Sequence, residues 1–232
     1  MKHFLLSPKF CHNATLRGSQ ALAILILLTL GLSLANAEDP KPTRGEAGDI
    51  LTPLTMGNTW VYEGDDDDPF ITIDRIEGVV IFDGQPWHML RSYERATDQP
   101  DAKDVPLGSE LWIAMIDGHE CDAFIETDEE TSVLKLSDMS KYFRYPATLG
   151  DTYQPNADDP TVVITVISLS EKITTKAGEF DCVVYKETST EDTSYSLTSY
   201  IAPGVGIVKN ITKEEQETFF SSLRSYTLVE KK

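Results

Sequence analysis

Residues 109–126 read SELWIAMIDGHECDAFIE, and this stretch predicts the fold more directly than any other part of the sequence. Two runs rich in apolar, aromatic and β-branched residues, 109–116 and 119–126, flank the dipeptide Asp117-Gly118. Asp-Gly between two such runs is typical of a two-residue β-hairpin turn, because both central residues of that turn need a positive φ. The stretch therefore predicts an antiparallel hairpin.

The same pattern of short strand-like runs and turn residues continues in both directions. Asp83-Gly84 predicts a second hairpin, and Gly78 predicts a β-bulge where the alternation of side chains shifts. Residues 137–143 are expected to form one short turn of helix. After the N-terminal segment we expect no amphipathic helix longer than this turn. The predicted strands are 58–63, 70–82, 87–95, 109–116, 119–126, 131–136, 161–169, 179–187, 195–202, 205–212 and 218–229.

About ten to twelve short strands joined mostly by turns predict an all-β protein. The expected architecture is an antiparallel meander that curls into an open or half barrel. A β-sandwich is the alternative, because a long sheet can also fold over on itself.

The N-terminal segment has the features of a signal peptide. Lys2, Lys9 and Arg17 precede the apolar run 21–35, and Ala35-Asn36-Ala37 supplies the small residues that signal peptidase accepts. A retained membrane anchor is the alternative, although the run is shorter than the roughly 20 residues that span a bilayer. We expect cleavage after Ala37 and an exported protein, periplasmic or secreted, with no membrane span in the mature chain. The expected organisation is a signal peptide over 1–37, a flexible leader over 38–50 and a single β domain over 51–232.

The chain is strongly acidic, with a formal net charge of −18 from 20 Lys+Arg against 38 Asp+Glu. This balance argues against nucleic acid, because phosphate binding needs clustered Lys and Arg. It also disfavours docking on anionic lipid. The acidic run 65–68 lacks the spacing of a calcium-binding loop and is interpreted as a solvated connector between strands.

The mature chain would keep two cysteines, Cys121 and Cys182. In an oxidising compartment they could form one disulfide. They could equally be two free thiols that pack as small apolar residues on separate strands. A metal site is not expected, because two cysteines far apart lack the spacing of metal ligands.

No catalytic motif stands out, and the sequence predicts no catalytic, cofactor-binding or metal-binding residue. His119 shares a strand face with Cys121, but two residues at i and i+2 are weak evidence for a nucleophilic pair. His88 is interpreted as an ordinary strand residue. Carboxylate pairs for a hydrolase are numerous and the sequence offers no means of choosing one, so a hydrolase stays an alternative.

Aromatic residues recur in the predicted strands. Trp60, Tyr62, Trp87 and Trp112 are candidates to line an apolar cavity in a curved sheet. Ordinary core packing is the alternative, since aromatic residues favour strands and dominate core area.

Residues 203–206, with Pro203, Gly204 and Gly206, predict a turn between two strands whose glycines are needed for backbone reasons. The stretches 56–62 (MGNTWVY), 176–182 (KAGEFDC) and 200–209 (YIAPGVGIVK) together resemble exported bacterial β-rich proteins. Those proteins carry G-N-x-W-x-Y near the start and A-P-G-V-G-x-V-K near the end. The resemblance implies a fold and an exported location, and it implies no activity.

These observations predict a non-enzymatic exported protein that serves as a binding module of the cell envelope. The expected partner is an apolar small molecule or another envelope protein. A purely structural or interaction protein without a ligand and an extracytoplasmic hydrolase are the alternatives.

Overall fold

The computed structural model describes residues 50–64, 70–97, 102–127 and 134–230. Within these ranges all regular secondary structure consists of β-strands. The expected signal peptide, nearly all of the expected leader and the acidic run 65–68 lie outside the described residues. The strands are β1 (Thr59–Glu63), β2 (Phe70–Phe82), β3 (Gln85–Ala96), β4 (Val105–Ile116), β5 (His119–Thr127), β6 (Leu134–Arg144), β7 (Thr152–Tyr153), β8 (Val162–Thr175), β9 (Gly178–Ser189), β10 (Ser196–Ala202), β11 (Gly206–Glu214) and β12 (Glu217–Thr227).

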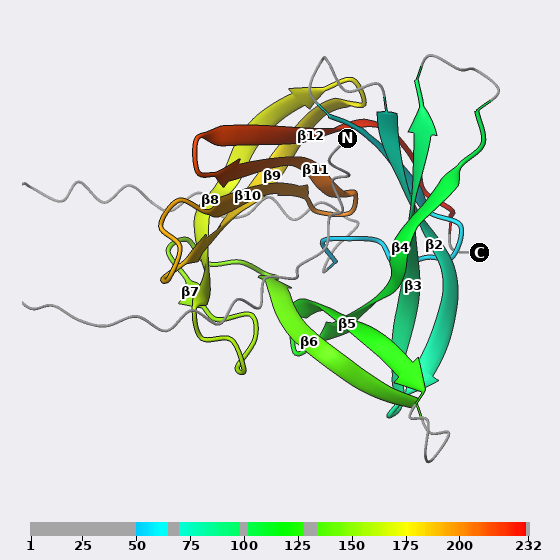
Figure 1. Ribbon diagram of the computed structural model, residues 1–232, viewed down its shortest axis with the longest axis horizontal. Coiled ribbons are helices and arrows are strands. Elements are labelled where there is room, and N and C mark those ends of the chain that lie inside the picture. The colour runs from blue at the N-terminus through cyan, green and yellow to red at the C-terminus, as the bar shows by residue number, and fades with distance from the viewer. Residues whose placement is uncertain (1–49, 65–69, 98–101, 128–133, 231–232) are drawn as a thin grey trace, which may run out of the picture. The chain divides into compact units, whose positions relative to one another are not determined.

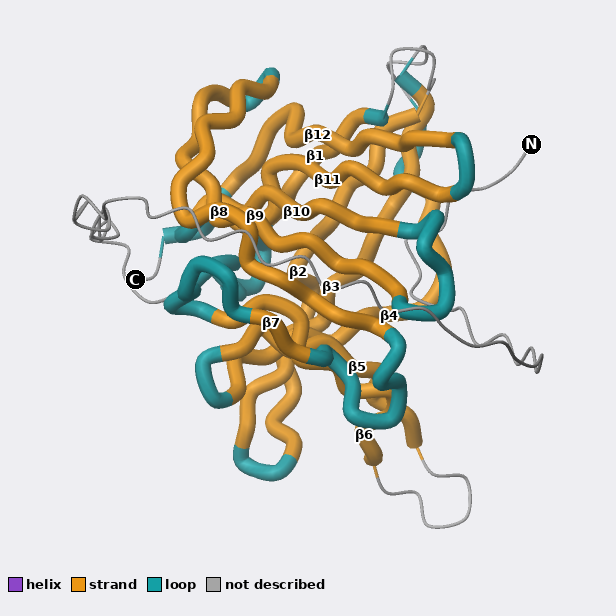
Figure 2. Tube along the Cα trace, turned by 90° about the vertical axis from the view of Figure 1, so that its left-hand side faces the viewer, coloured by secondary structure: helices purple, strands orange, loops and turns teal. Residues whose placement is uncertain are grey.

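All twelve strands belong to one antiparallel sheet, in the order β6-β5-β4-β3-β2-β1-β12-β11-β10-β9-β8-β7. Strands that follow one another in the chain pair with each other, except β6 and β7, which form the two ends of the sheet, and β1 pairs with β12 in its middle. Figure 1 shows that the sheet curls, with β8–β11 on the left of the view and β2–β4 on the right. Figure 2 shows β10, β11 and β12 side by side. The predicted all-β antiparallel meander is confirmed, as a single open sheet.

The predicted hairpin turns form as their residues require. Asp117 and Gly118 have φ values of 50° and 74°, and Asp83 and Gly84 have the same pair of values. Two successive positive φ angles match the right-handed twist of the flanking strands, so each turn joins its strands directly. The register of β2 against β3 shifts between Ile76 and Gly78, which confirms the predicted bulge.

The expected helical turn over 137–143 is wrong, because these residues lie in β6. β6 pairs with β5, with Cys121 opposite Lys141 and Asp122 opposite Ser140. Two register shifts interrupt this pairing, so β6 lacks the clean alternation of polar and apolar residues from which a strand is recognised in sequence. Pairing with a neighbouring strand overrides the weak local preference of these residues.

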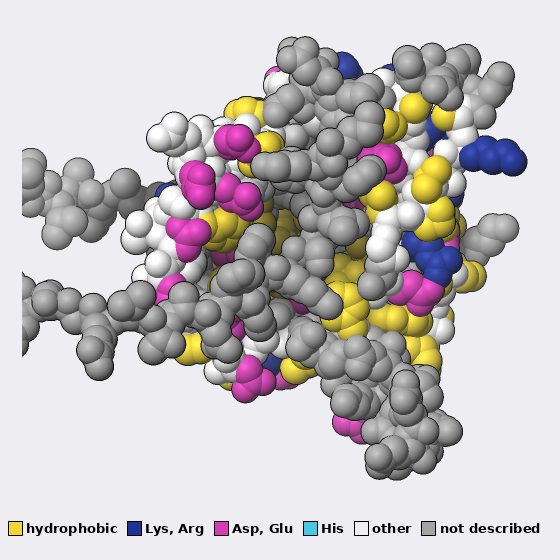
Figure 3. All heavy atoms as spheres, viewed as in Figure 1, with side chains coloured by type: hydrophobic (Ala, Val, Ile, Leu, Met, Phe, Trp, Pro, Cys, Tyr) yellow, Lys and Arg dark blue, Asp and Glu magenta, His cyan; other side chains and the backbone are white. Residues whose placement is uncertain are grey.

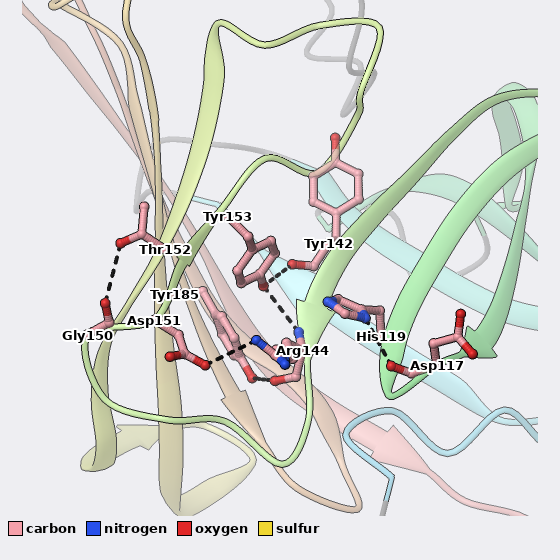
Figure 4. Close-up of polar contacts among 9 residues, drawn as sticks. All are labelled: Asp117, His119, Tyr142, Arg144, Gly150, Asp151, Thr152, Tyr153 and Tyr185. Carbon is pink, nitrogen blue, oxygen red and sulfur yellow. Dashed lines mark hydrogen bonds and ion pairs between the residues drawn. The ribbon is translucent and has the colours of Figure 1, made fainter.

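The two strands at the ends of the sheet, β6 and β7, are joined by a polar seam that Figure 4 shows in close-up. The Tyr153 hydroxyl on β7 accepts a hydrogen bond from the Arg144 amide at 3.1 Å and donates to the Tyr142 carbonyl at 2.5 Å. Tyr185 of β9 donates to the Arg144 carbonyl at 2.6 Å. Side-chain hydroxyls therefore satisfy backbone groups of an edge strand that would otherwise be exposed for pairing with another chain.

Three hydrophobic clusters form the core of the described residues. The first surrounds Trp60, Tyr62 and Leu223 and the second surrounds Leu51 and Tyr185. The third contains Trp87, Ala114, Cys121 and Ala123. Among the described residues no helix is long and apolar enough to cross a membrane.

Candidate functional site: an acidic interior beside the strand β5

The two sequence motifs 56–62 and 200–209, which lie near the two ends of the β domain, are in direct contact. The Trp60 indole N–H on β1 donates to the Val205 carbonyl at 2.6 Å, and the Tyr62 hydroxyl donates to the Ile207 carbonyl at 3.1 Å. Val205 lies in the turn between β10 and β11. Both aromatic side chains are buried, so each hydrogen bond removes the penalty of a buried polar group.

The segment before β1 is held against the same turn. The Gly204 amide lies 3.0 Å from both the Ile50 and the Leu51 carbonyl oxygens. Gly206 has a φ of +104°, and a Cβ atom there would lie 3.3 Å from Thr52 Cγ2. The predicted glycine turn thus has a specific purpose, since it lets the chain around Thr52 approach the sheet closely.

Asn58 anchors the other end of that segment and is fully buried. Its side-chain amide donates to the Pro53 carbonyl at 2.6 Å, and its side-chain oxygen accepts from the Val229 amide at 2.7 Å. One side chain therefore joins the entry segment to the C-terminal end of the chain. Residues 50–54 are fixed in place between Asn58 and the 203–206 turn.

Glu120 on β5 lies beside this segment and is 93% buried, with 7% of its surface exposed. Cys121 and Ala123 pack into the third cluster, so the alternation of a strand turns Glu120 and Asp122 together to the opposite face. Burial raises the pKa of Glu120 to about 7, although the Thr52 hydroxyl and amide act to lower it. In the described part of the chain, Oε2 of Glu120 and the Thr52 hydroxyl both lack a hydrogen-bond partner of good geometry.

Asp122 extends the acidic surface from Glu120 toward β9. Burial raises its pKa to about 8, and the charges of Glu120 and Glu187 add to the effect. Glu187 lies on β9, where its Oε1 accepts a hydrogen bond from the Tyr195 hydroxyl at 2.9 Å. Burial also raises the pKa of Glu187, although this hydrogen bond opposes the shift. The carboxyls of β5 and β9 are therefore near enough to influence each other across the interior.

A fourth carboxyl, Asp74 on β2, belongs to the same interior. Its Oδ1 accepts a hydrogen bond from the Ser92 hydroxyl at 2.6 Å, and burial raises its pKa to about 6. The pKa of Tyr62 is raised by burial and then by the charges of Asp74 and Glu120. Tyr62 is thus close enough to two carboxyls, one from β2 and one from β5, for both to act on it.

The basic residues of the neighbouring strands do not neutralise these carboxyls. Arg75 follows Asp74 on β2 and therefore points to the other face of the sheet, where it forms an ion pair with Asp104 at 2.5 Å. Arg95 binds the same carboxylate at 2.5 Å, and Arg91 pairs with Glu110. Among the described residues, no lysine or arginine is among the groups that shift the pKa values of the four interior carboxyls.

Aromatic and apolar side chains surround the acidic groups. Glu120 lies opposite Phe143 on β6 and opposite Met115 on β4, and Asp122 lies opposite the buried Ile113. The Phe143 ring centroid is 5.0 Å from that of Tyr185 and 5.9 Å from that of Tyr142. The interior therefore combines carboxyls that no basic side chain of the described residues neutralises with a cluster of three aromatic rings. We call Glu120, Asp122, Glu187 and these three rings the acidic–aromatic site.

The four aromatic residues predicted to line one cavity are divided between two places. Trp60 and Tyr62 lie in the first core cluster, whereas Trp87 and Trp112 lie in the third. The pairing of Trp60 with Asp74, and of Asp74 with Ser92, places Trp60 on one face, and alternation along β3 places Trp87 on the other. The four residues do not line a single cavity, because the sheet separates the two pairs.

Cys121 and Cys182 are free thiols in this structure, so they do not form the disulfide that the sequence left open. Cys121 packs in the third cluster and Cys182 in the first. Burial raises the pKa of Cys121 to about 11 and that of Cys182 to about 12. The Cys121 thiol points to the His119 backbone carbonyl at 3.7 Å, so it is not paired with the imidazole as a nucleophile would be.

The His119 ring belongs to the seam (Figure 4). Its Nδ1 lies 3.1 Å from the Asp117 carbonyl oxygen, and its ring meets Tyr153 edge-on at 5.6 Å. The described residues contain no group of three His, Cys, Asp or Glu side chains placed to hold a metal ion. The residues that form the acidic–aromatic site were not predicted from the sequence.

Comparisons with known proteins agree with the fold. Residues 162–225, from β8 into β12, match the DUF3108-like family model. No curated protein matches the chain. The chain is similar to the crystal structure of a candidate exported protein with a YmcC-like fold from Bacteroides fragilis, with a TM-score of 0.50 and 14% identity over 78% of this chain and 100% of the other. A candidate lipoprotein from Parabacteroides distasonis has a TM-score of 0.48 and 15% identity over 77% and 99% of the two chains. At 14% identity, the likeness to the Bacteroides fragilis protein shows the fold alone.

Proposed function

We propose that the protein is a non-enzymatic exported binding module of the cell envelope, and that its ligand occupies the acidic–aromatic site. The observation that carries this proposal is Glu120, a carboxyl that is 93% buried and leaves one oxygen without a partner. Such a group lowers stability, and a protein retains it where a ligand or a reaction uses it. An exported location is supported by the N-terminal sequence and by the descriptions of the structurally similar proteins.

Binding fits the site better than hydrolysis. A carboxyl pair for acid–base catalysis needs two environments that move the pKa values apart, so that one group is protonated while the other is ionised. Burial raises the pKa values of Glu120 and Asp122 in the same direction, to about 7 and about 8. The two thiols are buried and protonated, which removes the remaining nucleophile candidates among the cysteines.

A partner-binding module without a small ligand is the second candidate, and one feature favours it. Val79 and Ile81 alternate on β2 near the Asp83-Gly84 turn, with 53% and 65% of their surfaces exposed. Figure 3 shows hydrophobic side chains on the half of the visible face that holds β3–β5, and acidic side chains over β9–β11. An exposed apolar surface of this kind suits contact with another protein.

Mass spectrometry of the protein purified from the envelope of its own host separates these functions. The binding module predicts an extra mass under native conditions that disappears on denaturation. A bare native mass at several protein concentrations, with a partner protein recovered instead after crosslinking through β2, would contradict the small-ligand function and support the second candidate. The denatured mass also tests cleavage after Ala37.

A further inference from the structure

We propose that the ligand of the acidic–aromatic site is an organic ammonium compound, in which a cationic nitrogen is attached to an apolar body. This inference rests on the proposed binding function and names the chemical class of the ligand. It is carried by the unpaired oxygen of Glu120 together with the rings of Phe143, Tyr142 and Tyr185. No basic side chain of the described residues neutralises this region.

The charge of the site selects a cation. Glu120 and Asp122 lie side by side on one face of β5, and Glu187 approaches from β9. An anionic ligand would add repulsion to a group of carboxyls that are already costly to ionise, whereas a cation would favour their charged form. A primary, secondary or tertiary ammonium group carries N–H donors that can bond to the free Oε2 of Glu120. A quaternary ammonium group has no N–H, but its positive charge also suits this oxygen.

The aromatic rings support the same class independently of the carboxyls. The Phe143 and Tyr185 ring centroids are 5.0 Å apart and tilted by 54°, and Tyr142 continues the cluster on β6. Aromatic faces attract ammonium groups, most strongly where water is excluded. Glu120 and Phe143 occupy paired positions on β5 and β6, so a cation held by the carboxyl would also lie beside the rings.

The apolar body is indicated by the other neighbours of the carboxyls. Ile113 lies opposite Asp122 and is 7% exposed, and Met115 lies opposite Glu120. Leu51 lies in the cluster that contains Tyr185. A bare metal cation would leave these groups without a partner, and the described residues do not supply a metal-ligand set. An alkylammonium compound has one part that suits each half of the site.

Titration calorimetry of the exported chain with three matched probes tests the ligand class. Octylammonium, octanoate and 1-octanol share one alkyl chain and differ in charge. We expect octylammonium to bind at least about tenfold more tightly than the other two, which corresponds to roughly 1.4 kcal/mol. Equal or tighter binding of octanol or octanoate would overturn the ammonium assignment and leave the binding function intact. Failure of all three probes, together with a bare native mass, would overturn both.

Variants locate the binding in the proposed site. Glu120→Gln keeps the shape and removes the charge, and it should weaken octylammonium binding about tenfold or more while changing octanol binding little. Asp122→Asn serves the same purpose if the first variant does not fold. Glu179→Gln removes an exposed carboxyl from β9 and should leave the affinity unchanged. An unchanged affinity in both interior variants would refute the site.

Proton release gives a further readout that a structural role would not produce. The titratable groups around Glu120 are Asp122, Tyr62 and Tyr185; Glu187 acts on Asp122, and both of these carboxyls act on Tyr142. A bound ammonium favours ionised carboxyls, so binding near pH 6.5 should release protons and the affinity should rise toward pH 8.5. Titrations in buffers of different ionisation enthalpy measure this release. Binding of octylammonium without proton release would contradict the role of Glu120 and Asp122.

Discussion

Replacement of Glu120 by glutamine should stabilise the free protein at alkaline pH. The carboxyl has a reference pKa of 4.5 and a pKa of about 7 in the folded protein, so folding favours its protonated form. A carboxyl with a raised pKa contributes its full stability below pH 4.5 and loses that stability as the pH rises through 7. At about 1.4 kcal/mol per pH unit, the loss amounts to roughly 3 kcal/mol by pH 8.5. Glutamine does not ionise and avoids this loss.

The assay is urea denaturation of wild type and Glu120→Gln at pH 4, 6 and 8.5. The free energies of unfolding should differ little at pH 4, and the variant should gain roughly 3 kcal/mol relative to wild type by pH 8.5. For a domain of this size that gain corresponds to about 6–12 °C in melting temperature. Removal of the Glu120 charge also relieves Asp122, whose pKa it raises, so this coupling acts in the same direction.

Glu179→Gln, an exposed change on β9, is the matched control and should show no pH-dependent difference from wild type. The reasoning would be refuted if the difference between wild type and Glu120→Gln were constant from pH 4 to 8.5. It would also be refuted if the variant were the less stable protein at pH 8.5. Either result would mean that the folded protein stabilises the Glu120 carboxylate enough to offset its burial.

Three further predictions concern the contacts that position the site, and urea denaturation measures the first two. Trp60→Phe should lose about 1–3 kcal/mol, because the part-buried hydrogen bond to the Val205 carbonyl loses its donor, and an unchanged midpoint would contradict this. Gly206→Ala should lose about 1–3 kcal/mol, because φ is +104° and a Cβ would lie 3.3 Å from a neighbouring carbon. In the control Gly84→Ala the added Cβ would have no atom within 4 Å, so this variant should lose less stability than Gly206→Ala. Equal losses would show that only the positive φ angle matters. Tyr153→Phe should accelerate hydrogen exchange of the Arg144 amide at least tenfold, since its acceptor is removed, and unaltered exchange would show that the seam is held without it.

The fold was predictable where local chemistry determines it. Asp117-Gly118 and Asp83-Gly84 need no distant contact to adopt two positive φ angles, and both turns form as expected. Residues 137–143 were predicted wrongly, because their conformation depends on pairing with β5 across two register shifts. The two-residue strand β7 was missed for the same reason, since only its pairing with β8 defines it.

The acidic–aromatic site was only partly encoded in local sequence. Alternation placed Cys121 and Ala123 on one face of their strand and therefore Glu120 and Asp122 on the other. Which of the two faces is buried depends on the curl of the whole sheet, which strand alternation does not specify. A usable signal existed in the hairpin 109–126, because its turn sets Ile113 and Met115 opposite the two carboxyls. Apolar cross-strand partners of acidic residues indicate burial.

Thr52 connects the residues that define the fold with those that form the site. Gly206 allows the chain around Thr52 to approach the sheet, and Thr52 in turn lies beside Glu120 and acts on its pKa. Substitution of Gly206 should therefore lower stability, whereas removal of the Glu120 charge should raise stability and weaken ligand binding. The sign of the change in stability therefore distinguishes a structural residue from a binding residue. A group that is retained for a ligand destabilises the ligand-free protein, so its removal raises stability.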